Sequence, residues 1–319
     1  MSLRPLAVLA LAFAAFSANA QGYPTKTIRL LVGFAPGGAN DILARIVGQK
    51  LADSMRQPVV VENRPGAAGL IAAEALAKSA PDGYTLMLGS TGTQTMAPHL
   101  TKLHYDALNA FTPISLVGST PNALVVRPTL PVQDVRELIE YAKTRPRLLT
   151  YASSGNGTTL HLAAALFAMM ADVELIHVSY KGNAPALTDV MAGQVDLMFS
   201  ALPPLLPLAK AGKLKILGVG SLERHRSAPD LPTIAEQGLP DYESGTWYGV
   251  FAPANLPGAV LDRLGVEMKK AIDDPKVREQ ITAQGVDPKA DTPAQFRQMF
   301  RDEYARWGAV IKKANIKAD

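Results

Sequence analysis

The chain has 319 residues, no cysteine and a formal net charge of +4. The absence of cysteine excludes disulfide bonds, thiol catalysis and thiolate metal sites. The basic residues are scattered, and no basic stripe interleaved with aromatic residues indicates a nucleic-acid surface, so no nucleic-acid partner is expected.

The first 20 residues have the pattern of a secretory signal peptide. Arg4 precedes a short apolar run, and Ala18-Asn19-Ala20 fits a small-residue cleavage site, so cleavage is predicted after Ala20. A membrane anchor is the weaker alternative, because the run is shorter than the roughly 20 residues that span a bilayer. No later segment of the sequence is long and apolar enough to cross a membrane. We therefore expect an exported protein, which in a bacterium is periplasmic.

Strands and helices alternate along the first part of the mature chain. Strands are expected over residues 28–32, 59–62, 85–88, 114–117 and 123–126. Apolar residues recur at helical spacing over 42–55, and an alanine-rich helix over 67–78 ends at the turn signal Pro81-Asp82-Gly83. This alternation predicts a parallel sheet covered by helices, with ligands at the carboxyl ends of its strands.

The second half repeats this order. Strands are expected over residues 148–152, 175–178, 195–199 and 214–219, with helices after Thr158 and over 185–192. Two such units, each with a glycine-rich loop before a helix, predict an α/β protein of two lobes with a ligand cleft between them. We expect residues 21–121 and 247–319 in lobe 1 and residues 122–246 in lobe 2, joined by strand-like crossings near 121–123 and 246–251.

The tail is predicted to be helical over residues 260–272, from Pro275, and over 293–314. The last of these helices carries an aromatic stripe at three-or-four-residue spacing: Phe296, Met299, Phe300, Tyr304 and Trp307. Such a stripe is typical of core packing, and we expect it to pack on lobe 1.

The junction between the first strand and the first helix indicates an anion site. Pro36, Gly37 and Gly38 lead from the strand into the helix, and glycine permits close approach of the backbone. The first N–H groups of a helix are unpaired and lie at the positive end of its dipole, so a carboxylate or a phosphate is the expected guest. Residues 153–159 form a Ser/Gly/Thr loop of the same kind in lobe 2, for which an ordinary capped turn is the alternative.

Polar residues of lobe 1 supply further candidates. Asp41 either stabilises the first turn of the helix or meets a donor on the ligand. Ser90 and Thr91 follow a predicted strand and are expected to face the same cleft, although loops after strands are commonly polar.

Two later segments are also candidates. Lys181 and Gly182 precede another helix, and a solvated charge is the alternative for the lysine. Trp247 and Tyr248 lie at the second crossing, where they either form a wall of the pocket or pack in the hinge.

Catalysis and cofactor binding are not indicated. Ser154 and His161 are seven residues apart, which corresponds to roughly 10 Å along a helix axis and is too far for a nucleophile and its base. The sequence has no G-x-S-x-G nucleophile motif and no nucleotide-binding glycine motif, and its histidines lack metal-ligand spacing. We therefore expect binding without turnover, no cofactor and no metal.

An ordered set of motifs resembles one protein family. The set consists of Tyr23-Pro24, residues 28–41, Glu62-Asn63-Arg64-Pro65-Gly66, Pro81-Asp82-Gly83-Tyr84, Tyr180-Lys181-Gly182, Gly193-Gln194-Val195-Asp196 and Trp247-Tyr248-Gly249. It covers essentially the whole mature chain and is similar to the periplasmic receptors of tripartite tricarboxylate transporters, often called the Bug family of extracytoplasmic solute receptors. The resemblance implies a type II periplasmic-binding-protein fold, in which two α/β lobes close on a carboxylated solute.

The resemblance also implies roles for the two loops and a partner. One half of the carboxylate site would be formed by Ala35, Pro36, Gly37, Gly38 and Asn40, and the opposite half by Ser153, Ser154, Gly155, Gly157 and Thr158. The receptor, expected to be a monomer, would deliver its ligand to a membrane transporter of one large and one small subunit and would perform no chemistry.

Several ligands and two other functions fit these observations. The ligand class includes mono-, di- and tricarboxylates, aromatic acids and amino acids. A sensory receptor for a signalling partner would have the same fold and cleft, and a serine-type hydrolase is a more distant alternative.

Overall fold

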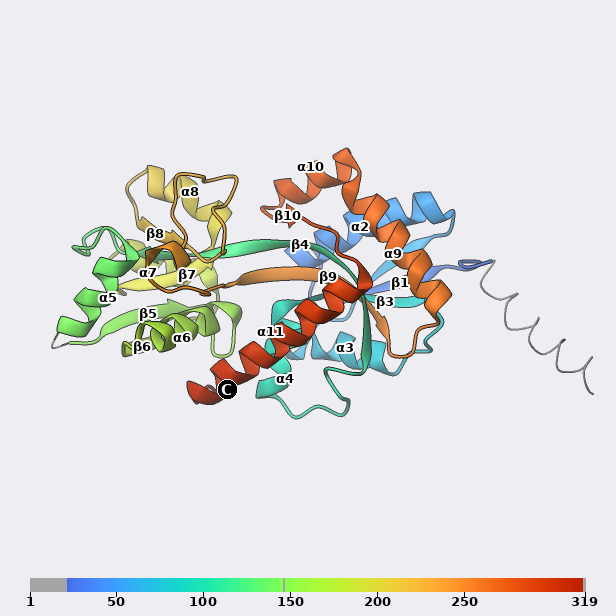
Figure 1. The fold of residues 1–319 in the computed structure, drawn as a ribbon, viewed down its shortest axis with the longest axis horizontal. Helices are drawn as coiled ribbons and strands as arrows, with labels where there is room; N and C mark the ends of the chain where they lie inside the picture. Colours follow the sequence, from blue (N-terminus) through green and yellow to red (C-terminus); the bar gives the residue numbers. More distant parts are fainter. Residues whose placement is uncertain (1–21, 146, 318–319) are drawn as a thin grey trace, which may run out of the picture.

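A computed structural model describes residues 22–145 and 147–317. The predicted signal peptide, with its cleavage after Ala20, lies outside the described residues. The chain forms an elongated molecule of two lobes, and two long strands, β4 (Phe111–Val126) and β9 (Gly245–Pro253), run between them (Figure 1). None of the helices over the described residues is long and apolar enough to span a bilayer.

The other strands are β1 (Ile28–Val32), β2 (Val59–Asn63), β3 (Thr85–Ser90), β5 (Leu149–Ser153), β6 (Leu175–Ser179), β7 (Leu197–Ala201), β8 (Lys215–Val219) and β10 (Asp287–Pro288). The α-helices are α2 (Ala39–Met55), α3 (Leu70–Ala77), α4 (Ala97–Leu100), α5 (Val135–Thr144), α6 (Thr159–Ala171), α7 (Asn183–Met191), α8 (Leu202–Lys210), α9 (Gly258–Asp273), α10 (Pro275–Ala283) and α11 (Pro293–Lys313). Short 3-10 turns are η1 (Ala67–Gly69) and η3 (Ala235–Gln237), and η2 (Gly92–Met96) is a π-helical turn.

Lobe 1 is built on a mixed sheet with the strand order β2-β1-β3-β9-β4. β1 pairs in parallel with β2 and β3, as the alternation of strands and helices predicts, and β9 is antiparallel to β3. On one face Leu30 of β1 packs with Leu43 of α2 and Leu264 of α9. The other face is covered by α3 and the first part of α11.

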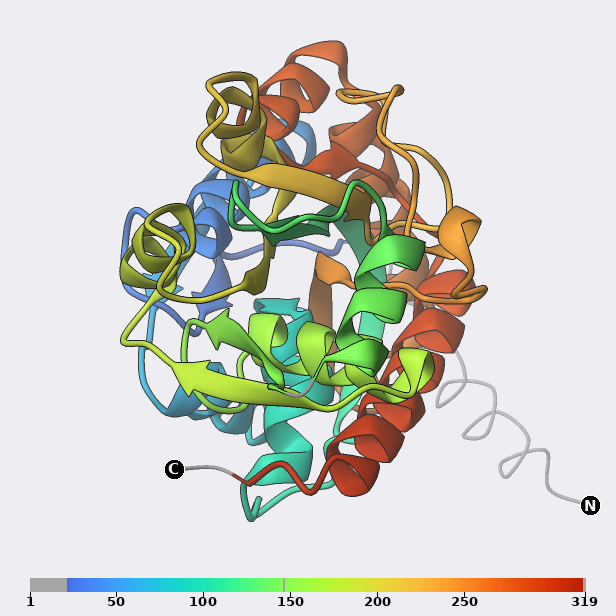
Figure 2. The same ribbon diagram turned by 90° about the vertical axis from the view of Figure 1, so that its left-hand side faces the viewer.

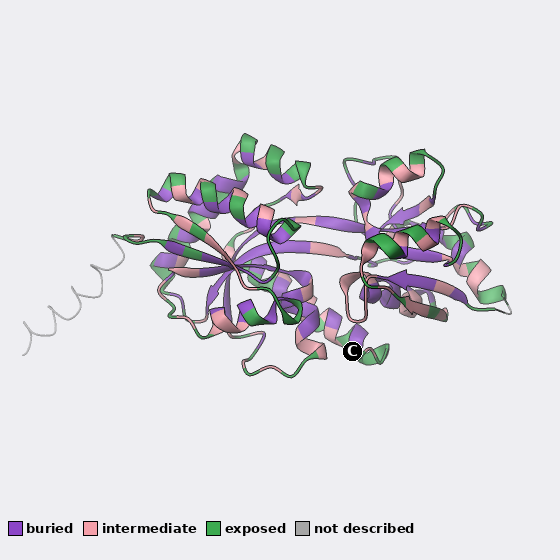
Figure 3. Cartoon of the chain, turned by 180° about the vertical axis from the view of Figure 1, so that it is seen from behind, coloured by how far each residue is buried: buried purple, intermediate pink, exposed green. Residues whose placement is uncertain are grey.

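Lobe 2 continues the sheet from the far half of β4. The strand order there is β4-β7-β5-β6, with β5 parallel to both of its neighbours, and β8 also pairs with β4. Leu162 and Phe167 of α6 bury one face, and Val190 of α7 and Leu202 of α8 bury the other. The central strands of both lobes are largely buried, the edge strands β2 and β6 are only partly buried, and the outer faces of the helices are exposed (Figure 3). The α/β fold class is thereby confirmed, and the residue boundaries of the lobes stay predictions.

The two short strands predicted over 114–117 and 123–126 form a single strand, β4, of 16 residues. β4 continues between the two predicted strands because β9 pairs with it as far as Pro121 and Gly245. The pairing shifts register between Pro113 and Ser115 and again between Leu116 and Gly118. Glycine and proline therefore mark irregularities of a continuous strand.

The aromatic stripe of α11 packs on both lobes, whereas the sequence predicted contact with lobe 1 only. Phe296 and Phe300 belong to the lobe 1 cluster around Phe251. Trp307 and Ile311 belong to the lobe 2 cluster that contains α6. Seen from the lobe 2 end, α11 runs down one side of the molecule (Figure 2). The helix therefore connects the two lobes in addition to β4 and β9.

Helices α5 and α8 were not among the predicted elements. α8 begins with prolines and has Pro207 inside it, and such a sequence reads as a loop because proline lacks an N–H donor. α5 begins at a cap, where the Asp134 side chain accepts a hydrogen bond from Glu137 N.

Gly249 of β9 provides a test of the packing between β9 and α11. A Cβ at this position would overlap the ring of Phe296. We expect Gly249→Ala to lower the free energy of unfolding by about 1 to 3 kcal/mol, because the ring of Phe296 is fully buried and the added methyl group would overpack the core. Gly258→Ala is the control, since a Cβ there meets no atom within 4 Å. Urea unfolding followed by circular dichroism measures both, and an unchanged midpoint for Gly249→Ala would contradict the packing.

Candidate functional site

A cavity of about 540 Å³ lies between the lobes, with β9 as its floor. Lobe 1 contributes the loop after β1 and the segment after β3, and lobe 2 contributes the loop before α6. The predicted site residues that line it are Gly38, Asn40, Ser90, Ser154, Gly157, Thr158 and Tyr248. The structure thus brings both predicted glycine-rich loops to one cavity.

The other predicted site residues do not line this cavity. Ala35, Pro36, Gly37 and Gly155 lie in the same two loops, and Thr91 and Ser153 are buried beside them. Lys181 and Gly182 lie at the start of α7. Trp247 lines a different cavity of about 400 Å³, and its ring packs against Phe251 and Phe296.

Sequence reasoning missed ten residues of the lining: Phe34, Ala39, Ala68, Gly92, Ala97, Leu100, Thr101, Asn156, Thr159 and Thr246. Phe34, Asn156 and Thr159 lie inside or beside the loops already identified, so adjacency in the sequence could have found them. Ala97 and Leu100 belong to α4, which follows an unpredicted π-helical turn. No pattern in the sequence indicated that this turn reaches the cleft.

Asp41 holds the loop between β1 and α2. Its carboxylate accepts hydrogen bonds from Gly37 N at 2.9 Å, from Arg45 at 2.9 and 3.0 Å, and from Asn63 Nδ2 at 3.0 Å. The Arg45 hydrogen bond is the largest cause that lowers the pKa of Asp41 to about 2. Two roles were considered for Asp41: stabilising the first turn of the helix and contacting the ligand. The contacts favour a structural role, because both carboxylate oxygens already accept hydrogen bonds from the protein.

The first turn of α2 is left without a cap. Gly38 is the N-cap residue, its backbone is extended, and no side chain accepts a hydrogen bond from the first turn. Asn40 is 8% exposed and lines the cavity, and its Oδ1 atom has no hydrogen-bond partner among the described residues. The positive end of the helix and a buried, unpaired polar side chain therefore face the same space.

The loop before α6 is bonded internally instead. Gly155 N donates to Ser153 Oγ at 3.2 Å, and Gly157 N donates to His161 Nδ1 at 3.1 Å. The Thr158 hydroxyl donates to Gly155 O and caps α6 by accepting from His161 N. The N–H groups of Gly155 and Gly157, which the sequence assigned to the ligand, thus have partners within the loop.

The loop before α6 is bonded to His161, which belongs to a stack of aromatic rings. The rings of His161 and His177 lie 3.9 Å apart with 18° between their planes, and Tyr151 stacks on His177 at 4.8 Å. His161 Nδ1 accepts a hydrogen bond and is therefore unprotonated at that atom. His161 is accordingly a buried residue that supports the loop through its hydrogen bond with Gly157.

A serine and a histidine do meet here, but not the predicted pair. Ser153 Oγ lies 2.7 Å from His177 Nε2. Ser153 is fully buried and also bonds Gly155 O at 3.1 Å, so its hydroxyl is turned into the protein. A nucleophile must be able to reach its substrate, and this contact therefore fits a structural role.

Tyr248 and Ser90 lie opposite each other on β9 and β3 at the floor of the cavity. Burial raises the pKa of Tyr248 to about 12, so its hydroxyl remains a neutral group. All the side chains that line the cavity are uncharged. A bound anion would therefore be held by backbone dipoles, amides and hydroxyls.

Two α/β lobes, joined by crossing strands with a cavity beside them, define a solute-binding receptor with a periplasmic-binding-protein fold. The family model described as tripartite tricarboxylate transporter family receptor matches residues 43–316. The chain belongs to this family, and the resemblance seen in the sequence is confirmed.

Relatives span nearly the whole chain. A UPF0065 protein from the tcbD-tcbE intergenic region of Pseudomonas sp. is 39% identical and covers 99% of this chain and 95% of its own length. BugT of Bordetella pertussis is 35% identical and covers 94% of this chain and 92% of its own.

Solved structures show the same fold with and without ligands. A protein of R. palustris with adipate is 36% identical, with a TM-score of 0.75 over 93% of this chain and 100% of its own. MatC of Rhodopseudomonas palustris with bound malate is 33% identical, with a TM-score of 0.72 over 91% of this chain and 100% of its own. A TctC solute-binding protein of Polaromonas with no ligand is 28% identical, with a TM-score of 0.82 over 91% of this chain and 99% of its own.

The contacts of Asp41 predict a pH-dependent contribution to stability. Its pKa is about 2 in the folded protein, below the value of about 3.9 in an unfolded chain, so the stabilisation is present above pH ~4 and is lost as the pH falls toward 2. We expect Asp41→Asn to lower the free energy of unfolding by about 1 to 2 kcal/mol at pH 7. Asp53→Asn removes the same charge from an exposed position of α2 and is the control. Urea titrations between pH 7 and pH 2 measure the difference in the free energy of unfolding between the parent and Asp41→Asn. If that difference does not change with pH, the stabilising role of the Asp41 carboxylate is contradicted.

Proposed function

We propose that the protein binds a small carboxylate between its lobes and delivers it to a tripartite-type membrane transporter. The observation that carries the proposal is the uncapped start of α2, where Gly38 and Asn40 line the cavity. The first-turn N–H groups suit one carboxylate oxygen pair. The adipate and malate bound to the two Rhodopseudomonas proteins support a carboxylate as the ligand class.

Several finer parts belong to the same proposal. The signal-peptide pattern supports export to the periplasm with cleavage after Ala20. Membership in a tripartite transporter receptor family supports docking on a membrane transporter. A transporter of one large and one small subunit, a monomeric receptor and the absence of catalysis are further parts of the proposal. Carboxylate contacts are assigned to the loop of residues 35–40 and to Ser154 and Thr158 across the cleft.

Ligand binding is coupled to lobe closure in this proposal. A ligand that touches both lobes binds the closed state more tightly than the open state and so shifts the population toward closure. The ligand-free Polaromonas protein has the higher TM-score, 0.82 against 0.75 for the adipate complex, although its sequence identity is lower. This contrast supports an open arrangement of the lobes in the present structure.

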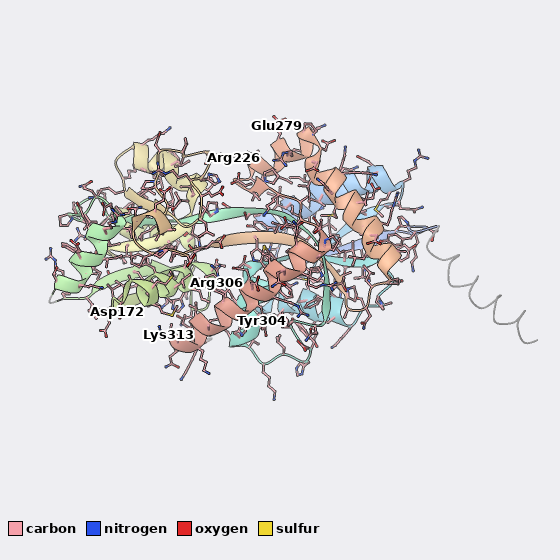
Figure 4. All side chains as sticks on the ribbon, viewed as in Figure 1. Asp172, Arg226, Glu279, Tyr304, Arg306 and Lys313 are labelled. Carbon is pink, nitrogen blue, oxygen red and sulfur yellow. The ribbon has the colours of Figure 1, made fainter. Side chains whose placement is uncertain are left out.

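Polar contacts on the opposite side of the crossing strands connect the lobes in this arrangement. Asp287 of β10 lies 2.5 Å from Arg226 and from His225, which belong to the loop after β8 in lobe 2. Arg306 of α11 donates to Glu243 O at 2.9 Å. Arg226 and Arg306 both lie at the boundary between the lobes (Figure 4).

Gly38→Val tests the site. The φ of Gly38 is −83°, and a Cβ there would come no closer than 3.9 Å to Ala35 O, so the variant is expected to fold. A β-branched side chain at this position covers the start of α2 and should weaken carboxylate binding about tenfold or more. Ligands are found by mass spectrometry of the purified protein and by thermal shift against a panel of carboxylates.

Gly258→Val, at the start of α9 and with nothing within 4 Å of its Cβ, is the matched control. If carboxylates stabilise the folded Gly38→Val protein as much as they stabilise the parent, the binding site does not lie at the start of α2. If no carboxylate stabilises the parent protein, the proposed function is wrong. An uptake assay in a deletion strain separates transport from a sensory role.

Asp287→Asn tests the coupling between lobes. Removal of the ion pairs across the boundary should make closure easier and raise ligand affinity by a factor of about 2 to 5, since partly exposed pairs contribute up to about 1 kcal/mol. Asp273→Asn is the control, because Asp273 pairs with Lys269 within α9. Calorimetric titration measures both, and lower affinity for Asp287→Asn would assign these ion pairs to the closed state.

A further inference from the structure

A groove of about 440 Å³ lies at the outer end of lobe 2, away from the cavity between the lobes. We call it the outer groove. It adjoins the start of β5 at Leu149, whereas the cavity between the lobes lies beyond the other end of β5, at Ser154. The sequence motif Gly193-Gln194-Val195-Asp196 supplies part of its lining. This motif therefore lies too far along the strands to contact a ligand between the lobes.

Asp196 fixes the inner wall of the outer groove. Its carboxylate accepts hydrogen bonds from Arg127 Nε at 2.9 Å, from Thr150 N at 3.0 Å and from Thr150 Oγ1 at 3.1 Å. These bonds join the end of β4, the start of β5 and the start of β7. Asp196 and Arg127 thus neutralise each other and act as a structural pair.

Two further arginines line the outer groove, Arg145 after α5 and Arg147 before β5. Both are exposed, and neither is joined to an acid by an ion pair within residues 22–145 and 147–317. The guanidinium group of Arg145 lies 3.9 Å from the centre of the Tyr141 ring, and this stacking orients it. Three arginines against one aspartate leave the lining with two excess positive charges.

Exposed apolar side chains flank these charges. Leu148 lines the groove and is 37% exposed. Ile176 is 46% exposed and lies on the edge strand β6, where it pairs with Thr150 of β5. α5, β5 and β6 together form this end of the molecule (Figure 1). Arginine, an aromatic ring and exposed aliphatic groups in one place are typical of a protein interface, whereas a merely solvated surface would not need the apolar groups.

We propose that the outer groove of lobe 2 is a docking surface for an acidic segment of the membrane transporter. The inference rests on the proposed function, because it assumes delivery to a transporter. Carboxylates of the segment bind the planar guanidinium groups of Arg145 and Arg147, and its apolar side chains lie against Leu148 and Ile176. Opposite charges on the two surfaces speed their encounter, so docking weakens as the salt concentration rises.

Charge reversal in the outer groove tests the inference. The double variant Arg145→Glu, Arg147→Glu is expressed in a strain that lacks the receptor, and uptake is measured with the acid that gives the largest thermal shift. Uptake should fall about tenfold or more, while the affinity of the purified protein for that acid stays within about twofold of the parent. The control is Arg297→Glu, Arg301→Glu, which makes the same charge change at exposed positions of α11 in lobe 1 and should keep uptake.

The outcomes of the uptake assay are distinguishable. Uptake equal to that of the parent in the folded outer-groove variant would overturn the inference and leave the proposed function intact. An equal loss of uptake in the lobe 1 control would also overturn it, because any acidic charge on the receptor would then be enough. Absence of uptake with the parent receptor itself would overturn both the inference and delivery to a transporter.

Sedimentation with membranes separates the transporter from lipid as the partner. The purified parent protein should bind membranes that contain the transporter about tenfold or more tightly than membranes of a matched strain without it, and added sodium chloride should weaken this binding. The Arg145→Glu, Arg147→Glu variant should lose the difference between the two membranes. Equal binding of the parent to both membranes, or to phosphatidylglycerol vesicles, would assign the groove to lipid headgroups and overturn the inference.

Discussion

The hydrogen bonds of the Asp41 carboxylate are the constraint on which the candidate site depends. They tie Gly37, Arg45 and Asn63 together, so that the loop after β1, the first turns of α2 and the end of β2 keep one geometry. An acid near an anion site would ordinarily repel the ligand. Arg45 offsets that charge, and the N–H groups of the first turn stay available because the carboxylate bonds the preceding loop and not the helix start.

The connection between the lobes limits how they can move. β4 and β9 pair with each other through the crossing, so closure requires the two strands to bend or twist together. Ser119 of β4 and the first two residues of β9, Gly245 and Thr246, are only partly buried, whereas most of the rest of both strands is buried. α11 adds a further constraint because Phe300 packs in lobe 1 and Trp307 packs in lobe 2. When lobe 2 moves relative to lobe 1, either α6 slides along α11 or the C-terminal end of α11 moves together with lobe 2.

Local patterns were enough to predict most of the elements, and long-range contacts account for the errors. β1, α2 and α11 follow from apolar spacing and from recognisable starts such as Gly38 and Thr292. The continuity of β4 depends on its pairing with β9, more than a hundred residues away, and no local pattern contains that information. The structure places both glycine loops at one cavity, and the ligand contacts of their residues stay a prediction. The N–H groups of Gly155 and Gly157 are bonded to Ser153 and His161, and no pattern in the sequence indicated these bonds.

The unequal loops also indicate how binding energy is divided between the lobes. The lobe 2 loop is held by the rings of Tyr151, His161 and His177, and it needs little further ordering when a ligand arrives. Its contribution to a ligand comes from neutral hydrogen bonds, each of about 1 kcal/mol, and from contact with the ligand body. In the proposed function, lobe 1 therefore holds the anionic group of the ligand. Lobe 2 then determines which ligands favour closure, because its contacts with a ligand bound to lobe 1 form only in the closed state.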